Sequence, residues 1–171
     1  MRKVLFIFGQ LTDSDVDWLA RAGRRQRLPA RAVLIREGVP VGTLYIVLEG
    51  QLRVVHDGSG REIASLEAGE IVGEMSFVDA RPPSATVYAA TDVVVYTISK
   101  AVLQDHLDRD VAFAARFYKA VATFLSDRVR KATEADDPDP KSVGQLDDSV
   151  LDNLDRAGAR FDALGRRLLD G

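Results

Sequence analysis

Residues Gly73–Val87 read GEMSFVDARPPSATV, and they indicate how the middle of the chain folds and where it could hold an anion. If a strand ends at Val72, a short helix is expected from Gly73 to about Asp79. The first N–H groups of such a helix lack partners within it and the helix dipole adds positive charge, so the helix start attracts anions. Gly73 would let the backbone approach a bound group closely because it has no side chain.

Glu74 and Ser84 add polar groups to this candidate anion site. A carboxylate repels phosphate, so Glu74 fits best as an acceptor for the hydroxyl groups of an attached sugar. Ser84, Ala85 and Thr86 would return along the neighbouring strand, where the Ser84 hydroxyl and N–H could reach the same anion. A purely structural turn with a Pro-Pro corner also fits these residues. This alternative stays open because lone glycine-containing motifs often match by chance.

Short apolar runs around this stretch predict a β-rich domain. From Arg24 to Ser99, β-branched and apolar runs alternate with Gly, Pro and Asp. The runs are AVLIREG, TLYIVLEG, QLRVVHDGSG, REIASLEAGE, SATVYAA and DVVVYTIS. Six or more strands within about 75 residues indicate a sandwich or a barrel. Asp57-Gly58 and Gly60 are expected to supply the positive φ angles of a tight hairpin, and Gly50 a sharp bend.

Helical periodicity flanks the predicted strands. Thr12 is expected to cap a helix over about 13–22, with Asp15 as its capping-box partner and Gly23 after its end. A short helix after Lys100 and a long one from about 109 to 133 are expected next. The long helix carries two apolar stripes, and the second indicates a further contact, such as a second subunit, because packing on one surface needs only one stripe. The stripes are Phe113, Phe117, Ala120 and Phe124, and Ala114, Tyr118, Val121, Leu125 and Val129.

After a domain formed by residues 1–133, the rest of the chain divides into a linker and one helix. Residues 134–148 begin with EADDPDPK, an acidic, proline-containing segment typical of a solvated linker. Residues 149–171 carry apolar residues spaced alternately four and three apart, as in an amphipathic helix. Such a short helix must pack on another surface to be stable. Its own domain and a partner subunit both remain open as that surface.

The composition narrows the class of protein. The 171 residues carry a formal charge of −3, which argues against a protein that mainly binds nucleic acid. The absence of cysteine excludes thiolate metal sites, and His56 and His106 are too few for a cupin-type metal site. The apolar run Val4–Phe8 is too short for a signal sequence or a membrane span. We therefore expect a cytoplasmic protein with no metal, no nucleic-acid partner and no membrane span.

Four segments resemble, in this order, the cyclic nucleotide-binding domain family, which includes the bacterial catabolite activator, regulatory subunits of cyclic-AMP-dependent kinase and cyclic-nucleotide-gated channels. They are IREG at 35–38, LYIVLEGQLRV at 44–54, LEAGEIVGEMSF at 66–77 and PPSATVYA at 82–89. The resemblance extends from about Phe8 to Arg130. It implies a mainly β fold: an eight-stranded, jelly-roll-like β-roll with a short N-terminal helix and long C-terminal helices.

The resemblance also implies roles for the residues of the opening stretch, which matches the family's phosphate-binding cassette. Gly73 matches the glycine at which the backbone approaches the sugar-phosphate, and Glu74 matches the carboxylate that binds the ribose 2′-hydroxyl. Met75 and Ser76 match residues whose N–H groups face the phosphate, and Ser84 matches a small or hydroxyl residue that also reaches it. The implied ligand is cyclic AMP or cyclic GMP. The implied ligand-binding residues are Gly73, Glu74, Met75, Ser76, Ser84 and Ala85.

The sequence departs from the family at Pro83, where the pattern has an arginine that pairs with the cyclic phosphate. Proline has neither a charge nor a backbone N–H. A charge-assisted contact to phosphate is worth roughly 1.5–3 kcal/mol, so its loss lowers affinity about tenfold to a hundredfold unless another group replaces it. Arg81, two residues upstream, is the candidate replacement, although a side chain at the end of the cassette helix more often points to water.

The resemblance implies a regulatory switch and not an enzyme. In the family, the nucleotide orders the cassette and the long C-terminal helix closes over the base. Phe117 and Tyr118 are candidates to cover the base, although ordinary helix packing is the commoner role for such residues. Too few residues remain after Thr133 for the DNA-binding winged helix-turn-helix that follows this helix in the catabolite activator.

Two functions therefore stay open on the sequence. The first is a stand-alone cyclic-nucleotide sensor that forms a homodimer and signals to an unidentified partner protein through its C-terminal helices. The second is a degenerate, nucleotide-free interaction or dimerisation module on the same fold, because Pro83 replaces the phosphate-binding arginine.

Overall fold

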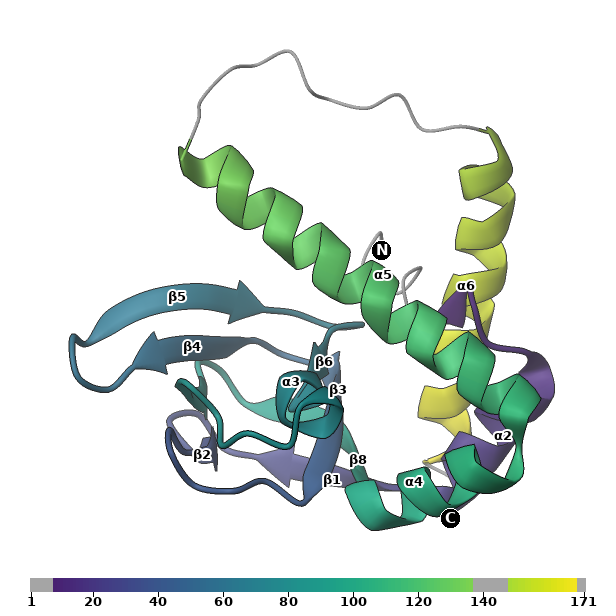
Figure 1. Ribbon diagram of the computed structural model, residues 1–171, viewed down its shortest axis with the longest axis horizontal. Helices are drawn as coiled ribbons and strands as arrows, with labels where there is room; N and C mark the ends of the chain where they lie inside the picture. Colours follow the sequence, from purple (N-terminus) through teal and green to yellow (C-terminus); the bar gives the residue numbers. More distant parts are fainter. Residues whose placement is uncertain (1–7, 137–147, 169–171) are drawn as a thin grey trace.

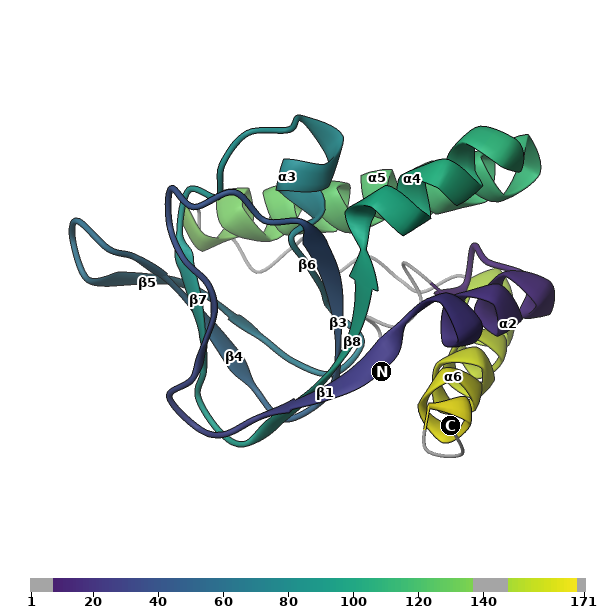
Figure 2. The ribbon, with the colours of Figure 1, turned by 90° about the horizontal axis from the view of Figure 1, so that it is seen from below.

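Two four-stranded antiparallel sheets form a β-roll in the computed structural model, which describes residues 8–136 and 148–168 (Figures 1 and 2). The strand orders are β1-β8-β3-β6 and β2-β7-β4-β5. The bounds are β1 (Arg24–Leu28), β2 (Val33–Ile35), β3 (Thr43–Glu49), β4 (Leu52–His56), β5 (Arg61–Leu66), β6 (Ile71–Val72), β7 (Thr86–Ala89) and β8 (Val93–Ser99). The predicted eight-stranded roll is confirmed.

Two of the strands have no apolar run of their own in the sequence. β1 has the sequence RRQRL and is an edge strand, where charged side chains are tolerated because one side of the strand has no neighbour. β6 has only two residues and pairs with Tyr45 and Ile46 of β3. Strand propensity alone could not identify either of them, and tertiary pairing with β8 and β3 defines both.

Glycines set two of the connections. Gly50 has a φ angle of 84° where the chain passes from β3 in one sheet to β4 in the other, which is the predicted bend. In the hairpin between β4 and β5, Gly60 has a φ angle of 64°. The prediction that Asp57 and Gly58 also adopt a positive φ is wrong, because the loop reverses with one left-handed residue, Gly60, whose N–H donates to the His56 carbonyl.

The helices are α2 (Asp13–Ala22), α3 (Glu74–Val78), α4 (Lys100–Arg109), α5 (Val111–Asp136) and α6 (Asp148–Arg167). In Figure 2, α3 and the long helix α5 lie along the top of the roll, and α2 and α6 lie together to its right. α2 has the predicted capping box between Thr12 and Asp15. The predicted start of the long helix at 109 is two residues early, because Asp110 is extended between α4 and α5 and its carboxylate accepts from the Phe113 N–H at 2.8 Å.

α5 buries one of its two apolar stripes. Phe113, Phe117, Ala120 and Phe124 join the core between the roll and the helices. In the second stripe, Tyr118 and Val129 are exposed although Val121 is buried. α5 includes residues 134–136 of the predicted linker, and residues 137–147 lie outside the described part of the chain.

α6 folds back onto its own domain and packs beside α2 (Figures 1 and 2). Ala157 and Leu164 are fully buried in the core that also contains Leu11, Val16 and Leu19. Phe161 packs edge-on against Phe8, with ring centroids 5.5 Å apart. Of the two surfaces that the sequence left open for this helix, its own domain is therefore one that it occupies.

Candidate ligand-binding site

The stretch Gly73–Val87 forms a strand end, a short helix and a return strand, as the sequence predicts. β6 ends at Val72, Gly73 adopts a left-handed conformation with φ of 89°, and α3 begins at Glu74. A Cβ atom at residue 73 would lie 3.0 Å from the Thr43 carbonyl oxygen, so both the backbone angle and the space favour glycine. The turn directs the Glu74 side chain inward, where it is buried.

A cavity of about 210 Å³ opens between the start of α3 and the inner face of the roll. Ile35, Val54 and Val87 contribute an apolar wall from the strands. The structure brings together all of the predicted ligand-binding residues along this cavity. They are Gly73, Glu74, Met75, Ser76, Ser84 and Ala85.

An arginine that the sequence reasoning missed reaches the same cavity from α5. Arg128 Nη1 lies 2.5 Å from Glu74 Oε1, and the guanidinium lies 4.7 Å from the centroid of the Phe124 ring. A signal for it exists in the sequence, because residue 128 is one turn after Phe124 and extends the buried stripe of α5. This position on the helix can be read from the sequence, but the partner of Arg128 cannot, because it depends on where α5 crosses the roll.

The buried Glu74 carboxyl is surrounded by charges of both signs. Burial raises the pKa of Glu74 above its usual value, and the positive charge of Arg128 opposes that rise. Lys100, the first residue of α4, is a second nearby cation, and burial lowers the pKa of its ammonium group against the opposing charges of Glu74 and Asp79. Its Nζ is buried and has no hydrogen-bond partner in the part of the chain that the structure describes.

Pro83 and Arg81 both line the cavity, but neither places a cation inside it. The Pro83 carbonyl accepts a hydrogen bond of 2.8 Å from the Gly38 N–H, which fixes the return loop. The Arg81 side chain is 83% exposed, and its Nε lies 3.5 Å from Asp79 Oδ2. Arg81 is therefore at the rim of the cavity, paired with a neighbouring carboxylate.

Phe117 and Tyr118, the residues proposed to cover a base, contact the outside of the cassette helix. Phe117 is buried and packs edge-on against Phe77, with ring centroids 5.9 Å apart. Tyr118 is partly exposed and stacks on the same ring at 6.5 Å. Neither is among the described residues that line the cavity. In this arrangement the two rings pack α5 against α3.

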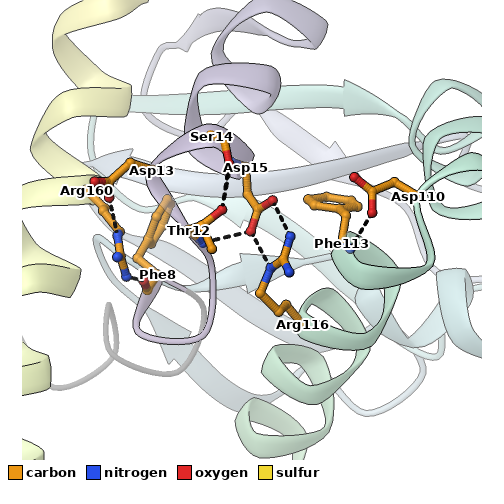
Figure 3. A network of polar contacts seen from close by, with 9 residues as sticks. All are labelled: Phe8, Thr12, Asp13, Ser14, Asp15, Asp110, Phe113, Arg116 and Arg160. Atoms are coloured by element: carbon orange, nitrogen blue, oxygen red, sulfur yellow. Dashed lines mark hydrogen bonds and ion pairs between the residues drawn. The ribbon is translucent and has the colours of Figure 1, made fainter.

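A polar network joins the first half of α5 to the N-terminal helix (Figure 3). Arg116 of α5 donates two hydrogen bonds to the buried carboxylate of Asp15 in α2, at 2.7 and 2.8 Å. Arg160 of α6 donates to Asp13 at 2.7 Å and to the Phe8 carbonyl at 3.1 Å. α5 thus contacts the cavity through Arg128 and contacts α2 through Arg116.

The structure thus combines an eight-stranded β-roll with a cavity beside the short helix α3. A family profile described as "Cyclic nucleotide-binding domain" matches residues 25–110, which is half of the chain. The chain therefore belongs to the cyclic nucleotide-binding domain family, as the sequence resemblance indicated. This family is regulatory and not catalytic. In the described residues after α5, the helix α6 is present and a helix-turn-helix module is not.

Similar proteins include whole domains and parts of larger proteins. The crystal structure of a cyclic nucleotide-binding domain from Methylobacillus flagellatus superposes with a TM-score of 0.71 at 25% identity, covering 85% of both chains. An uncharacterized NTE family protein of Mycobacterium tuberculosis is 26% identical over 164 residues, 94% of this chain and 27% of that protein. A cyclic nucleotide-gated potassium channel of Mesorhizobium japonicum is 33% identical over 98 residues, 57% of this chain and 26% of the channel. The chain thus spans about a quarter of the length of these two relatives.

Two further properties of the described residues concern membranes and metals. No described helix has both the length and the apolar character needed to cross a bilayer. Likewise, within residues 8–136 and 148–168, no three His, Cys, Asp or Glu side chains are grouped so as to hold a metal ion.

Proposed function

We propose that this chain is a regulatory module that binds cyclic AMP or cyclic GMP in the cavity beside α3 and signals to a partner protein through α5 and α6. The observation that carries the proposal is the ion pair between Glu74 and Arg128. Glu74 belongs to the cassette and Arg128 to α5, so a ribose that engages the Glu74 carboxylate acts directly on a contact that holds α5. Ligand binding then favours one position of α5 over another.

The relatives and the exposed surface of α5 support the rest of the proposal. The potassium channel is gated by cyclic nucleotides according to its name, and it is much longer than the matched segment. We therefore propose that the present domain also serves another protein or domain, whose identity is open. The exposed Tyr118 and Val129 support a homodimer through the C-terminal helices. The proposal places the protein in the cytoplasm.

Calorimetric titration with cyclic AMP and cyclic GMP tests the proposal. Saturable binding of at least one nucleotide is expected, and Glu74→Ala should weaken it about tenfold or more because the 2′-hydroxyl loses its acceptor. Glu62→Ala is the matched control, since Glu62 is an exposed carboxylate on β5 that pairs with Arg53. If neither nucleotide at millimolar concentration produces heat or a thermal shift, the proposed function is wrong.

A second candidate function is a nucleotide-free interaction module on the same fold. Pro83 and the outward position of Arg81 favour it, because they leave the cassette loop without a cation directed into the cavity. In that case Glu74→Ala should leave the interaction with every partner unchanged, provided that the variant is folded. A loss of partner binding in Glu74→Ala that nucleotide also modulates would instead support the sensor.

A further inference from the structure

The cavity lacks an arginine at position 83, so we consider which other charged side chains are near an anion that would bind there. Among the described residues, four charged side chains line the cavity: Glu74, Asp79, Arg81 and Arg128. Asp79 and Arg81 pair with each other at the rim, so their charges compensate. Glu74 and Arg128 form the buried pair. The cavity lining by itself therefore has no excess charge of either sign.

Lys100 changes this balance, because it places a second cation beside Glu74. Its backbone N–H donates to the Gly42 carbonyl at 3.0 Å, which fixes the start of α4 next to the strand residue Thr43 that Gly73 contacts. Its Nζ is buried without a hydrogen-bond partner in residues 8–136 and 148–168, and it lies within electrostatic reach of Glu74. Glu70, the other carboxylate near Glu74, does not line the cavity and accepts a hydrogen bond from the Glu67 N–H. Ionised Glu74 is thus shared by two cations.

We propose that Arg128 supplies the positive charge that Pro83 lacks, contacting the cyclic phosphate from α5 while Lys100 compensates Glu74. This inference rests on the proposed function and names the residue that recognises the anionic group of the ligand. Of the two arginines among the described residues that line the cavity, Arg81 pairs with Asp79 at the rim, which leaves Arg128 as the arginine that can face the negative charge of a cyclic phosphate. A guanidinium has five N–H donors, so Arg128 can keep Glu74 within reach and still donate to a phosphate at the start of α3.

Because Arg128 comes from α5, its contact with the phosphate would couple ligand binding to the position of that helix. An arginine at position 83 would belong to the roll and would hold the phosphate without contacting α5. Arg128 is on α5 itself, so the phosphate charge would act on the position of that helix directly. Binding of the anionic group and displacement of α5 would then be one event, with a shared free energy.

A double-mutant cycle between residues 128 and 83 tests the inference, with cyclic AMP as the titrant. Arg128→Gln is expected to lower the affinity about tenfold to a hundredfold, and Arg128→Lys, which keeps the charge, to lower it less. Pro83→Arg should restore most of the affinity that Arg128→Gln loses, and should increase the affinity of the wild-type chain by a smaller factor. Lys100→Met should also weaken binding, because Glu74 would lose its second cation and would then hold Arg128 away from the phosphate. Lys119→Gln, which removes an exposed cation from the same helix, is the control and should bind like wild type.

The outcomes separate this inference from the proposed function. If Arg128→Gln binds cyclic AMP as tightly as wild type, or if Pro83→Arg increases the affinity by the same factor with and without Arg128, then Arg128 does not act in place of an arginine at position 83 and the inference is wrong, although the site is retained. If the wild-type chain does not bind and Pro83→Arg does, no existing residue replaces the arginine, and the inference again fails. If neither chain binds while circular dichroism shows both to be folded, the proposed function fails and the inference fails with it.

Discussion

Gly50 shows how one residue fixes the passage of the chain between the two sheets of the roll. The loop that precedes β8 crosses directly over it: the Gln51 N–H donates to Thr91 Oγ1 at 3.1 Å, and the Ala90 N–H donates to the Gln51 carbonyl at 2.8 Å. A Cβ atom at residue 50 would lie 2.3 Å from the Asp92 carbonyl oxygen. Glycine is needed here both for its positive φ and for this close approach.

Gly50→Ala is therefore expected to destabilise the domain by about 3 kcal/mol or more, because backbone must move in addition to the strain of a positive φ. Gly38→Ala is the matched control: its φ is 74°, but no atom lies within 4 Å of the added Cβ, so about 1 kcal/mol is expected. Urea unfolding followed by circular dichroism measures both free energies. Equal losses in the two variants would show that the close approach at Gly50 has no energetic weight.

Residues of the site were predictable from sequence to different degrees. Gly73 and Glu74 belong to a local strand-turn-helix, so their spacing in the chain already implies their spacing in the cavity. Arg128 is 54 residues from Glu74, and its role depends on the direction in which α5 crosses the roll. The residues that the Lys100 side chain approaches depend in the same way on the direction in which the chain passes from β8 to α4. Neither direction follows from local periodicity, so these two cations required the structure.

At the scale of elements, α2 connects the long helix to the C-terminal helix through its aspartates. Asp15 binds Arg116 of α5, while Asp13 and Asp17 pair with Arg160 and Arg167 of α6. Burial alone would raise the pKa of Asp15, but the hydrogen bonds from Arg116 and Thr12 and the charge of Arg116 outweigh it and hold the pKa below its usual value. The folded state therefore favours the ionised form of Asp15.

This preference predicts how the stability of the domain depends on pH. Because the folded pKa of Asp15 is below its unfolded value of 3.8, its contribution is complete above pH 3.8 and is lost as the pH falls further. Arg116→Gln should lower the free energy of unfolding by about 3 kcal/mol at pH 7, since it leaves a buried carboxylate without its cation. The difference in unfolding free energy between Arg116→Gln and wild type should narrow as the pH falls below 3.8, because protonated Asp15 no longer needs a cation.

Urea unfolding between pH 7 and pH 3 checks this dependence. Arg109→Gln is the control, because Arg109 pairs with Asp105 on the exposed face of α4 and such pairs contribute about 0.5 kcal/mol. A difference between Arg116→Gln and wild type that stays constant across the whole pH range would mean that the Asp15 charge is not the source of the stabilisation.

Element boundaries show why the sequence prediction was accurate for α2 and less so for α5. Thr12, Asp15 and Gly23 are local start and stop signals, and they fix α2 at Asp13–Ala22. Asp110 ends α4 and also caps α5, so the periodic pattern continues through a break of one residue. The apolar period alone cannot reveal such a break. The edge position of β1 is likewise a property of the assembled sheet.

For the whole molecule, α5 is the element that connects its parts. Its first half contacts α2 through Arg116 and packs on α3 through Phe117 and Tyr118, and Arg128 in its second half reaches the cavity. The buried stripe of α5 accounts for its packing on the domain. The second stripe is only partly covered: Tyr118 is 43% and Val129 is 63% exposed, which supports the proposed contact with a second copy of the chain.

The double variant Tyr118→Glu/Val129→Glu is therefore expected to convert a dimeric wild-type protein to a monomer, because two buried carboxylates would oppose the helix contact. Sedimentation velocity at several protein concentrations measures the mass of each species. Ile63→Glu is the matched control: Ile63 is an apolar residue, 55% exposed, on β5 of the roll, and its replacement should leave the dimer intact. A monomeric wild-type protein, or an unchanged dimer in the double variant, would show that α5 does not form this interface. If the dimer does form there, cyclic nucleotide should alter its dissociation constant, since Arg128 is on the helix that the two copies would share.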